Sequence, residues 1–556
     1  MNIVSKKLLI VIPTIVILFV AVMLSDTIEK RIDDISETIM DDELIGDMEQ
    51  QLESLTARII VKGEEYKIKG YYSKSKEQWC IVIPAGYQDQ KVFLEAKMTN
   101  GEKQTFSRIP SEGEMIFTWK DTHYPIDFIW ANNIETLYVT LNNKKDLNDV
   151  HESKKQKFSG TLSAFDVNGS FKQVKVKSFW GHGNDSWESE KKSYNLKFDG
   201  YADLLGMEEN DDFVLLAGYR DNSLMSYVTT TELVREVGFP YAPEYRLVNL
   251  FVAGEYVGVY FLTEKIEIDK NRIDIPSVYE ETKKVNSKTL DFFDYQRWSD
   301  EDELAKKYYY DVENNPEDIT GGYLLEIDVA DYEDDDSRFV SKRRIKLTMK
   351  RARYSSKEEV DYMWEFWTDF ENALFSETGK NDKGKHYSEY IDVESFAMQW
   401  LFYELEQEGS LMSSIYYYKE SDVNGDGLLH ASYPWDMEHS YRMSDKIDEF
   451  GLATSSALKG YWRAFYQHED FRNVLRTVWD EKIAPAVEKM ISEDAVCAEN
   501  GMKNLRWYLS NSIDMHMLEN SRWDLMHPWD KCSEIEDILS LRLNVISNAL
   551  KESGDH

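Results

Sequence analysis

Two glycines and a pair of lysines stand close together between Phe179 and Phe198, in the run FWGHGNDSWESEKKSYNLKF. The glycines are Gly181 and Gly183, and the lysines lead into a segment in which apolar and polar residues alternate. This pattern predicts a strand, a glycine turn and a second strand. Glycine lets a backbone approach an anion closely, and lysine supplies a point charge for a phosphate. The stretch therefore fits either a nucleotide-phosphate site or an ordinary hairpin.

A pair of carboxylates forms a second candidate site, in the run YPWDME. Asp436 and Glu438 lie two residues apart after an expected strand. Residues at this spacing share one face of an extended segment, so the pair can hold Mg²⁺ together with substrate phosphates. The alternative is that one carboxylate is buried and caps a loop while Glu438 is solvated.

The run DVNGDG, from Asp422 to Gly427, opens like a calcium-binding loop. Its twelfth position is Tyr433, where such a loop needs a bidentate glutamate, and the expected flanking segments are strands rather than helices. The run therefore favours a hairpin turn over a calcium site.

Two acidic positions border other expected elements. Asp221 or Asn222 is a natural N-cap for an amphipathic helix that the pattern predicts up to Val237. Glu264 ends a predicted strand, and a glutamate there either pairs with a lysine of the glycine–lysine stretch or lies exposed.

The amino terminus carries Lys6 and Lys7, followed by an apolar run from Leu8 to Leu24. No small-residue cleavage pattern follows the run, so residues 1–25 predict an uncleaved signal anchor, with a cleaved signal peptide as the alternative. The positive flank predicts a cytoplasmic amino terminus and an extracytoplasmic location for the residues that follow.

The rest of the chain predicts an α+β protein. Residues 26–56 are polar and acidic and predict a juxtamembrane stalk, whereas short alternating runs over residues 57–129 predict a small all-β module. Residues 130–551 begin with strands joined by glycine turns and end in a helical part. This order predicts a domain with a strand-rich lobe and a helical C-terminal part.

The composition sets limits on partners and metals. The 556 residues include 102 acidic and 65 basic ones, for a net charge of −37. Such a surface repels nucleic acid, so nucleic-acid binding is not expected. Cys80, Cys497 and Cys532 are scattered without metal-ligand spacing, so neither a zinc cluster nor a disulfide framework is expected.

Four segments together resemble the CotH protein kinases, named for a spore-coat protein, and specifically their clostridial membrane-anchored relatives. They are the glycine–lysine stretch, the helix and hairpin from Tyr219 to Ile268, the strand GGYLLEID, and the run SSIYYYK followed by PWDME. The resemblance covers about residues 130–545, with the segments in the family's order. The β-rich stretch before residue 130 resembles an accessory region of these relatives.

The resemblance implies an atypical protein-kinase fold that uses ATP with Mg²⁺ or Mn²⁺. It implies phosphotransfer to serine or threonine of surface or spore-coat proteins. Lys192 resembles the nucleotide-contacting lysine, with Lys197 as a second candidate and Glu264 as its possible ion-pair partner. Asp436 resembles the metal-binding aspartate, with Glu438 beside it.

The chain departs from the family pattern at three positions. His182 stands where the turn usually begins with arginine, and Glu438 stands in place of an aspartate. The aspartate expected ten residues before the hairpin lysine falls on Gly409. Glu406 and Glu408 lie beside that position and are the candidate replacement bases.

The favoured function is a membrane-anchored, extracytoplasmic kinase that transfers the γ-phosphate of ATP. A nucleotide-binding pseudokinase is one alternative, because Gly409 removes the usual base. A non-catalytic module that binds cell-wall polymer or a coat protein is the other. A glycan-processing enzyme fits poorly, because its paired acids must flank a sugar from opposite sides.

Overall fold

The computed structural model describes most of the chain after residue 50. The described residues are 51–84, 92–107, 109–110, 113–131, 133–221, 223–286, 297–300, 306–327, 336–350, 355–407, 414–444, 446–451, 459–498, 501–511, 513–523 and 528–552. The expected signal anchor, residues 26–50 of the expected stalk, Asn222, Glu408 and Gly409 lie outside them. In the described part, no helix has both the length and the apolar character needed to cross a membrane.

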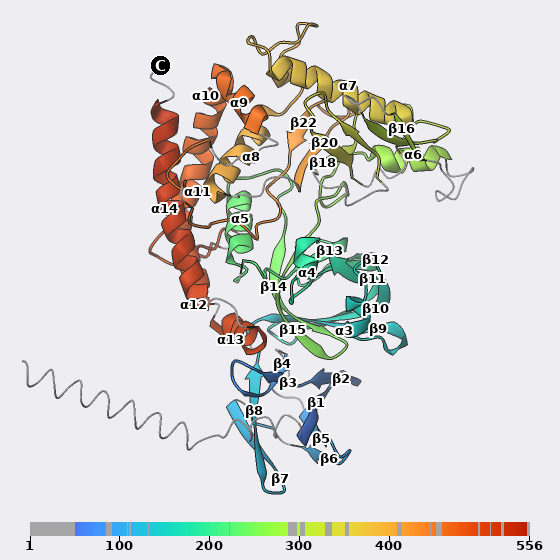
Figure 1. Ribbon diagram of the computed structural model, residues 1–556, viewed down its shortest axis with the longest axis vertical. Coiled ribbons are helices and arrows are strands. Elements are labelled where there is room, and N and C mark those ends of the chain that lie inside the picture. The colour runs from blue at the N-terminus through green and yellow to red at the C-terminus, as the bar shows by residue number, and fades with distance from the viewer. Residues whose placement is uncertain are drawn as a thin grey trace, which may run out of the picture. The chain divides into compact units, whose positions relative to one another are not determined.

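The chain divides into two compact units, and the first consists of short strands up to Trp130 (Figure 1). The strands are β1 (Leu52–Val61), β2 (Glu64–Lys69), β3 (Tyr71–Ser73), β4 (Gln78–Ile83), β5 (Val92–Met98), β6 (Lys103–Phe106), β7 (Gly113–Trp119) and β8 (Thr122–Trp130). They pair in the orders β2-β1-β5-β6 and β3-β4-β8-β7. Alternate residues of β1, such as Ala57 and Ile59, are buried, as the sequence alternation predicts.

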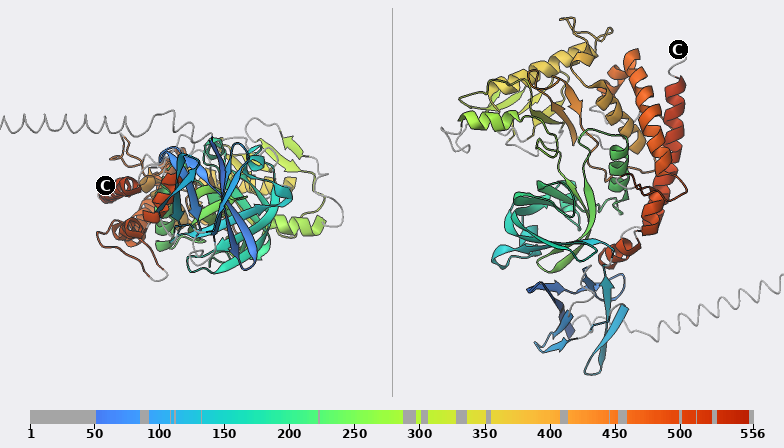
Figure 2. Two further views of the ribbon diagram at one scale, coloured as in Figure 1. Left: turned by 90° about the horizontal axis from the view of Figure 1, so that it is seen from below. Right: turned by 180° about the vertical axis from the view of Figure 1, so that it is seen from behind.

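The second unit begins with a lobe whose strands close into a barrel (Figure 2). The strands are β9 (Glu135–Leu141), β10 (Phe158–Phe165), β11 (Phe171–His182), β12 (Ser193–Ala202), β13 (Asn210–Leu216), β14 (Tyr245–Val252) and β15 (Glu255–Glu264). Their order is β13-β12-β11-β10-β9-β14-β15, and pairing of β13 with β15 closes the ring. Val139, Leu162 and Leu196 belong to the apolar cluster that fills the lobe.

Three helices belong to this lobe: α3 (Leu147–His151), α4 (Asp185–Glu188) and α5 (Met225–Glu236). Helix α5 contacts α11 and α14 of the helical part, and its side chains from Met225 to Val234 are buried. Leu224 has a left-handed backbone, with φ of 62°. The helix therefore begins at Met225, later than the sequence pattern predicts.

A second, antiparallel sheet follows the barrel lobe in the order β16-β17-β19-β20-β18-β21-β22. Its strands are β16 (Arg297–Asp300), β17 (Lys307–Tyr310), β18 (Tyr323–Ile327), β19 (Arg338–Val340), β20 (Lys346–Met349), β21 (Ile415–Lys419) and β22 (Leu429–Ala431). Its helices are α6 (Val278–Asn286), α7 (Lys357–Leu374) and α8 (Val393–Glu406). Helix α7 begins at Lys357, because Ser356 and Glu359 form a reciprocal capping box.

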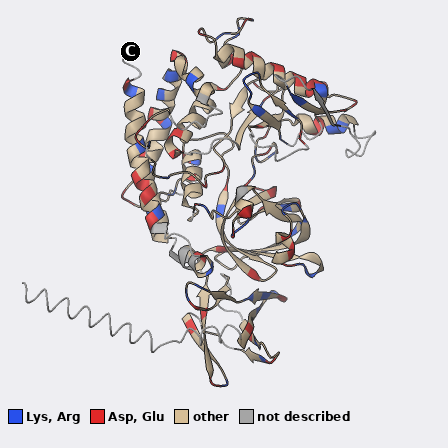
Figure 3. Ribbon diagram, in the orientation of Figure 1, with Lys and Arg blue, Asp and Glu red and all other residues tan. Residues whose placement is uncertain are grey.

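The C-terminal part is helical. It contains α9 (Lys459–Gln467), α10 (Glu469–Val478), a π-helical turn (Trp479–Ile483), α11 (Ala484–Met490), α12 (Leu505–Asn511), α13 (Ile513–Arg522) and α14 (Pro528–Glu552). The predicted α+β architecture, with a strand-rich lobe before a helical part, is confirmed for the described residues. Figure 3 shows that acidic and basic residues are spread over many elements of both units.

Candidate functional site

Three carboxylates from two distant segments interact in the second unit. Asp221 lies in the connection from β13 to α5, whereas Asp436 and Glu438 lie in the irregular segment after β22. Glu438 is buried, with 5% of its surface exposed, and Asp436 is exposed. Asp436 has a left-handed backbone, with φ of 68°, which is uncommon for a residue other than glycine. The left-handed backbone thus occurs at a residue that the sequence predicts to bind metal.

The surroundings of Glu438 disfavour its ionised form. Burial and, to a smaller extent, the nearby Asp436 and Asp221 carboxylates raise the pKa of Glu438 to about 7, against the opposing effect of Arg220 and Lys191. Among the described residues, none donates a hydrogen bond to this carboxylate. A buried carboxylate near two others is a suitable environment for a divalent cation, because the cation offsets their mutual repulsion.

Asp221 links this group to the start of α5. Its carboxylate accepts hydrogen bonds from Ser226, through the hydroxyl at 2.5 Å and the backbone N–H at 3.2 Å. Arg442 then joins the two segments, because its Nη2 donates to the carbonyl oxygens of Arg220 and Glu438 at 2.9 Å and 2.8 Å. The N-cap prediction is wrong for Asp221, because Leu224 occupies the N-cap position and Asp221 contacts the helix from three residues before it. Asn222 lies outside the described residues.

Lys191 is the buried lysine of the glycine–lysine stretch. Its Nζ donates to the carbonyl oxygens of Ala217 at 2.9 Å and Val259 at 2.6 Å, and it forms an ion pair with Glu519 of α13. Burial lowers the pKa of Lys191, whereas Glu519 and, more weakly, Glu438 oppose that shift. Lys191 therefore brings a positive charge close to the carboxylates.

The predicted nucleotide lysines have other partners in the structure. Lys192 donates to the carbonyl oxygens of Trp187 at 2.5 Å and Ser189 at 3.1 Å, which belong to its own turn. Lys197 pairs with Asp211 at 3.1 Å and Asp212 at 3.2 Å. Neither lysine is brought to the carboxylates by a contact within the described residues.

The two glycines of the stretch are required by the turn itself. A Cβ on Gly181 would lie 2.4 Å from the Trp187 ring. Gly183 has φ of 77°, and a Cβ there would lie 1.9 Å from the Ser186 hydroxyl. His182, between them, is bonded to Asn195 at 3.1 Å, and burial lowers its pKa to about 4. The packing of the turn thus accounts for both glycines.

Glu264 does not pair with Lys192 in the structure. Its carboxylate accepts hydrogen bonds from the Asn210 side chain at 3.3 Å and from the backbone N–H of Glu244 at 3.1 Å. Burial raises its pKa. These bonds hold β13, β15 and the start of β14 together at one end of the barrel.

Glu406, one of the two candidate bases, is enclosed by protein. It is 1% exposed, and its carboxylate accepts hydrogen bonds from the hydroxyls of Thr230 at 2.9 Å and Ser440 at 3.4 Å. Its backbone oxygen accepts from the Tyr441 N–H at 2.9 Å. Glu406 therefore connects the end of α8 to α5 and to the segment that carries Glu438. Glu408 lies outside the described residues.

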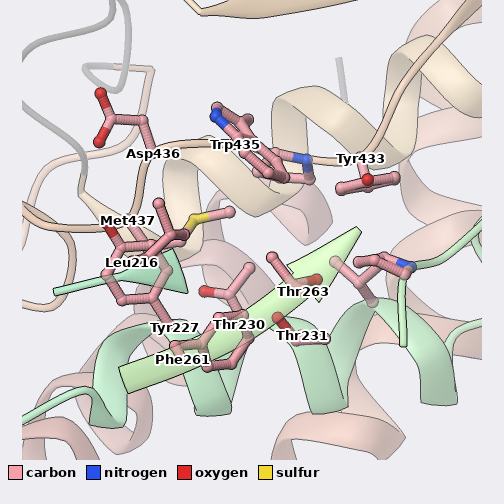
Figure 4. A pocket seen from close by; sticks show the side chains of 13 residues that line it. Leu216, Tyr227, Thr230, Thr231, Phe261, Thr263, Tyr433, Trp435, Asp436 and Met437 are labelled. Atoms are coloured by element: carbon pink, nitrogen blue, oxygen red, sulfur yellow. The ribbon is translucent and has the colours of Figure 1, made fainter. Parts of the chain in front are cut away.

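A small apolar pocket, partly open to solvent, adjoins Asp436. Its walls come from β13, β15, α5 and the segment after β22, and include Leu216, Phe261 and Met437. Figure 4 shows the Asp436 carboxylate at one edge, directed away from Thr230. The pocket thus offers an apolar surface beside the carboxylates.

Sequence reasoning missed Asp221, Lys191 and Glu519 as members of this neighbourhood. Lys191 lies two residues before β12, so the alternation that places Tyr194 and Leu196 in the barrel does not assign its side chain. Asp221 was considered only as a helix cap. Nothing local to Glu519 indicates its partner, because 328 residues separate the two charges.

Comparison with known proteins gives one family. No curated protein matches the chain. The family model described as CotH kinase protein matches residues 181–493, which is more than half of the chain and includes the lysine stretch, α5, β21, β22 and the Asp436–Glu438 segment. The chain therefore belongs to the CotH kinase protein family.

Proposed function

We propose that this protein is a membrane-anchored, extracytoplasmic kinase that transfers the γ-phosphate of ATP to serine or threonine of surface or spore-coat proteins. The observation that carries the proposal is the convergence of Asp221, Asp436 and Glu438 with Lys191 beside an apolar pocket. Family membership supports kinase-like chemistry. The anchor rests on the apolar run from Leu8 to Leu24 in the sequence.

Asp436 and Glu438 are the proposed holders of Mg²⁺ or Mn²⁺. Their oxygens are the hard donors that these ions prefer, and the buried Glu438 carboxylate has no hydrogen-bond donor among the described residues. When bound, the metal would neutralise charge on the phosphates. Asp221 adds negative potential to the same place, while its bonds to Ser226 keep it fixed.

Cations from two elements would face the phosphates. Arg220 is exposed and acts electrostatically on Glu438, and its planar guanidinium suits bidentate contact with a phosphate. Lys191 contributes a positive charge from inside the protein. This charge is fixed in place, because Nζ is already bonded to the carbonyl oxygens of Ala217 and Val259 and to the Glu519 carboxylate. Gly181, Gly183, Lys192, Lys197 and Glu264 stay predicted nucleotide contacts. Lys192 would have to leave its turn carbonyls to make one.

A nucleotide-binding pseudokinase is the second candidate function. It is favoured by the enclosure of Glu406, which is 1% exposed and whose carboxylate accepts hydrogen bonds from Thr230 and Ser440. Phosphoryl transfer depends mainly on positioning and electrostatics, so the loss of a base does not decide between the two functions. Glu408 stays the remaining predicted base.

The test combines two measurements on the full-length protein. A thermal-shift titration with ATP, with and without Mn²⁺, reports binding, and transfer of label from γ-labelled ATP reports catalysis. A metal-dependent shift with label transfer is the expected result for a kinase. A shift without transfer would indicate the pseudokinase, and the absence of both would overturn nucleotide binding altogether.

A further inference from the structure

The turn between β21 and β22 brings three metal-ligating side chains together. The Nε2 atom of His430 lies 3.0 Å from Oδ2 of Asp426 and 3.9 Å from Oε1 of Glu420. One ligand atom from each residue lies within 4.8 Å of the others. Asp426 belongs to the run that resembles a calcium loop, and Glu420 and His430 lie on either side of it. The structure confirms that this run is a hairpin turn.

The atom of each side chain that faces away from the cluster already has a partner. Nδ1 of His430 is bonded to Oδ2 of Asp392 at 3.2 Å. Oδ1 of Asp426 accepts from the Leu428 N–H at 2.8 Å, and Oε2 of Glu420 accepts from the Asp426 N–H at 3.3 Å. These contacts leave Nε2, Oδ2 and Oε1 directed at one another. A carboxylate on the far nitrogen is the arrangement that orients metal-binding histidines.

The surrounding turn is also held firmly. The His430 ring is 8% exposed and stacks on Tyr418 with a centroid distance of 4.8 Å. Lys419 donates to the carbonyl oxygens of Thr320 and Glu420 at 2.9 Å and 2.6 Å. The ligands therefore do not depend on a freely moving loop. Asp426 is exposed, so an ion and its water ligand have access from solvent.

We propose that Glu420, Asp426 and His430 bind one divalent transition-metal ion, with Zn²⁺ as the best-matched ion. One imidazole nitrogen and two carboxylate oxygens suit Zn²⁺, which accepts both donor types and leaves a fourth position for water. Ca²⁺ prefers six or more oxygen ligands, so the histidine disfavours it. This site is separate from Asp436 and Glu438 in the chain and does not depend on the proposed kinase activity.

The proposed ion would tie the hairpin turn to helix α8. Asp392 is the N-cap of α8, and its carboxylate contacts both the Glu394 N–H, at 3.2 Å, and His430. The other end of α8 carries Glu406, which contacts α5 and Ser440. Metal binding at the turn would therefore stabilise the helix that spans from this turn to the candidate site.

The experiment is calorimetric titration of ZnCl₂ into the full-length protein. The background carries Asp436→Asn, Glu438→Gln and Cys497→Ser, so that the other carboxylate site and the exposed cysteine do not contribute. One Zn²⁺ should bind per chain, and Ca²⁺ should bind far more weakly. Asp426→Asn and His430→Gln should each remove the binding. Asp392→Asn should weaken it by about 10- to 100-fold, because it removes only the orienting contact.

The matched control is Asp422→Asn, because Asp422 lies in the same turn but pairs with Lys419 at 2.9 Å. This variant should bind Zn²⁺ like the background protein. Visible absorption after loading with Co²⁺ gives a second readout of the ligand set. The proposal is overturned if no Zn²⁺ binds, if Asp426→Asn binds as the background does, or if Asp422→Asn loses binding equally. Circular dichroism of every variant separates loss of a ligand from loss of folding.

Discussion

Lys191 and Glu519 form a buried ion pair although 328 residues separate them in the chain. Lys191 has no exposed side-chain surface, and Glu519 is 10% exposed. Glu519 belongs to α13, which lies beyond the residues matched by the family model. The pair thus fixes a C-terminal helix against the barrel, at the lysine that acts on Glu438.

Breaking this pair from one side should destabilise the second unit strongly. Glu519→Leu leaves the Lys191 ammonium buried without its counter-ion, which typically costs about 3–5 kcal/mol of unfolding free energy. The double variant Lys191→Met with Glu519→Leu removes both charges and should recover much of that loss. Urea unfolding of the wild type, both single variants and the double variant measures the coupling.

A surface pair provides the control for this cycle. Nζ of Lys482 lies 2.5 Å from Oε1 of Glu394, and the two side chains are 37% and 50% exposed. Lys482→Met should change the unfolding free energy far less than Lys191→Met, because water already solvates both charges of the surface pair. Equal losses in the two variants would show that Lys191 and Glu519 are not paired in the folded protein.

Gly258→Ala should disturb the same contact from the barrel side. Gly258 has φ of 125°, and a Cβ there would lie 2.9 Å from Oε2 of Glu519 and 2.9 Å from Nε1 of Trp523. Gly200 has a comparable φ of 105° but no atom within 4 Å of such a Cβ. Gly258→Ala should therefore lower the free energy of unfolding by about 1–3 kcal/mol more than Gly200→Ala does. A similar loss in both would attribute the effect to backbone strain alone.

Local patterns predicted the larger features of the fold. The start of α7 at its Ser356 cap and the hairpin of β21 and β22 follow from capping and turn chemistry. The closure of the barrel by β13 and β15 could not be predicted, because nothing in either strand alone specifies its distant partner.

The candidate site was predicted in part. The spacing predicts that Asp436 and Glu438 are near each other, but the expected extended segment with both on one face is wrong. Asp436 has a left-handed backbone and is exposed, whereas Glu438 is buried rather than solvated. The family resemblance predicts Lys192 as the nucleotide-contacting lysine, whereas the lysine that is buried and acts on Glu438 is Lys191. Its partner Glu519 lies outside the four segments that carry the family resemblance, so no motif indicates it.

Asp436→Asn should abolish the metal-dependent part of ATP binding. The variant keeps the size of the side chain but removes its charge, and a divalent ion then loses one of the two proposed carboxylate ligands. The measurement is the thermal shift with ATP in the presence and absence of Mn²⁺. Asp448→Asn, which neutralises an aspartate elsewhere in the second unit, serves as the control and should retain the shift. Full retention in Asp436→Asn would remove the metal assignment.

Glu406→Gln should behave as a structural substitution rather than a catalytic one. Its carboxylate accepts hydrogen bonds from the hydroxyls of Thr230 and Ser440 inside the protein. The glutamine amide would place an N–H donor where the wild type has only acceptor oxygens. We expect a lower melting temperature with metal-dependent ATP binding retained. The companion Thr230→Val, which removes one of these bonds, should lower stability in the same direction. Loss of label transfer without a change in melting temperature would instead support a catalytic role.

The buried Glu359 gives the protein a pH-dependent stability term. It lies in the first turn of α7, where it accepts hydrogen bonds from the Thr282 hydroxyl and from the Ser356 N–H. Burial raises its pKa to about 7 despite these bonds, and the charge of Glu358 contributes to the rise. Tyr323, whose own pKa is raised, also faces this carboxylate.

Because the folded pKa of Glu359 is above the unfolded value of 4.5, the folded protein holds a proton that the unfolded chain releases. The stabilising contribution is present below pH 4.5 and is lost as the pH rises toward 7, by roughly 3 kcal/mol in total. Glu359→Gln cannot ionise, so its unfolding free energy should gain on that of the wild type across this interval. Urea unfolding at several pH values measures the difference, with Glu358→Gln as the matched neighbour. Parallel curves for wild type and Glu359→Gln would show that Glu359 titrates normally in the folded protein.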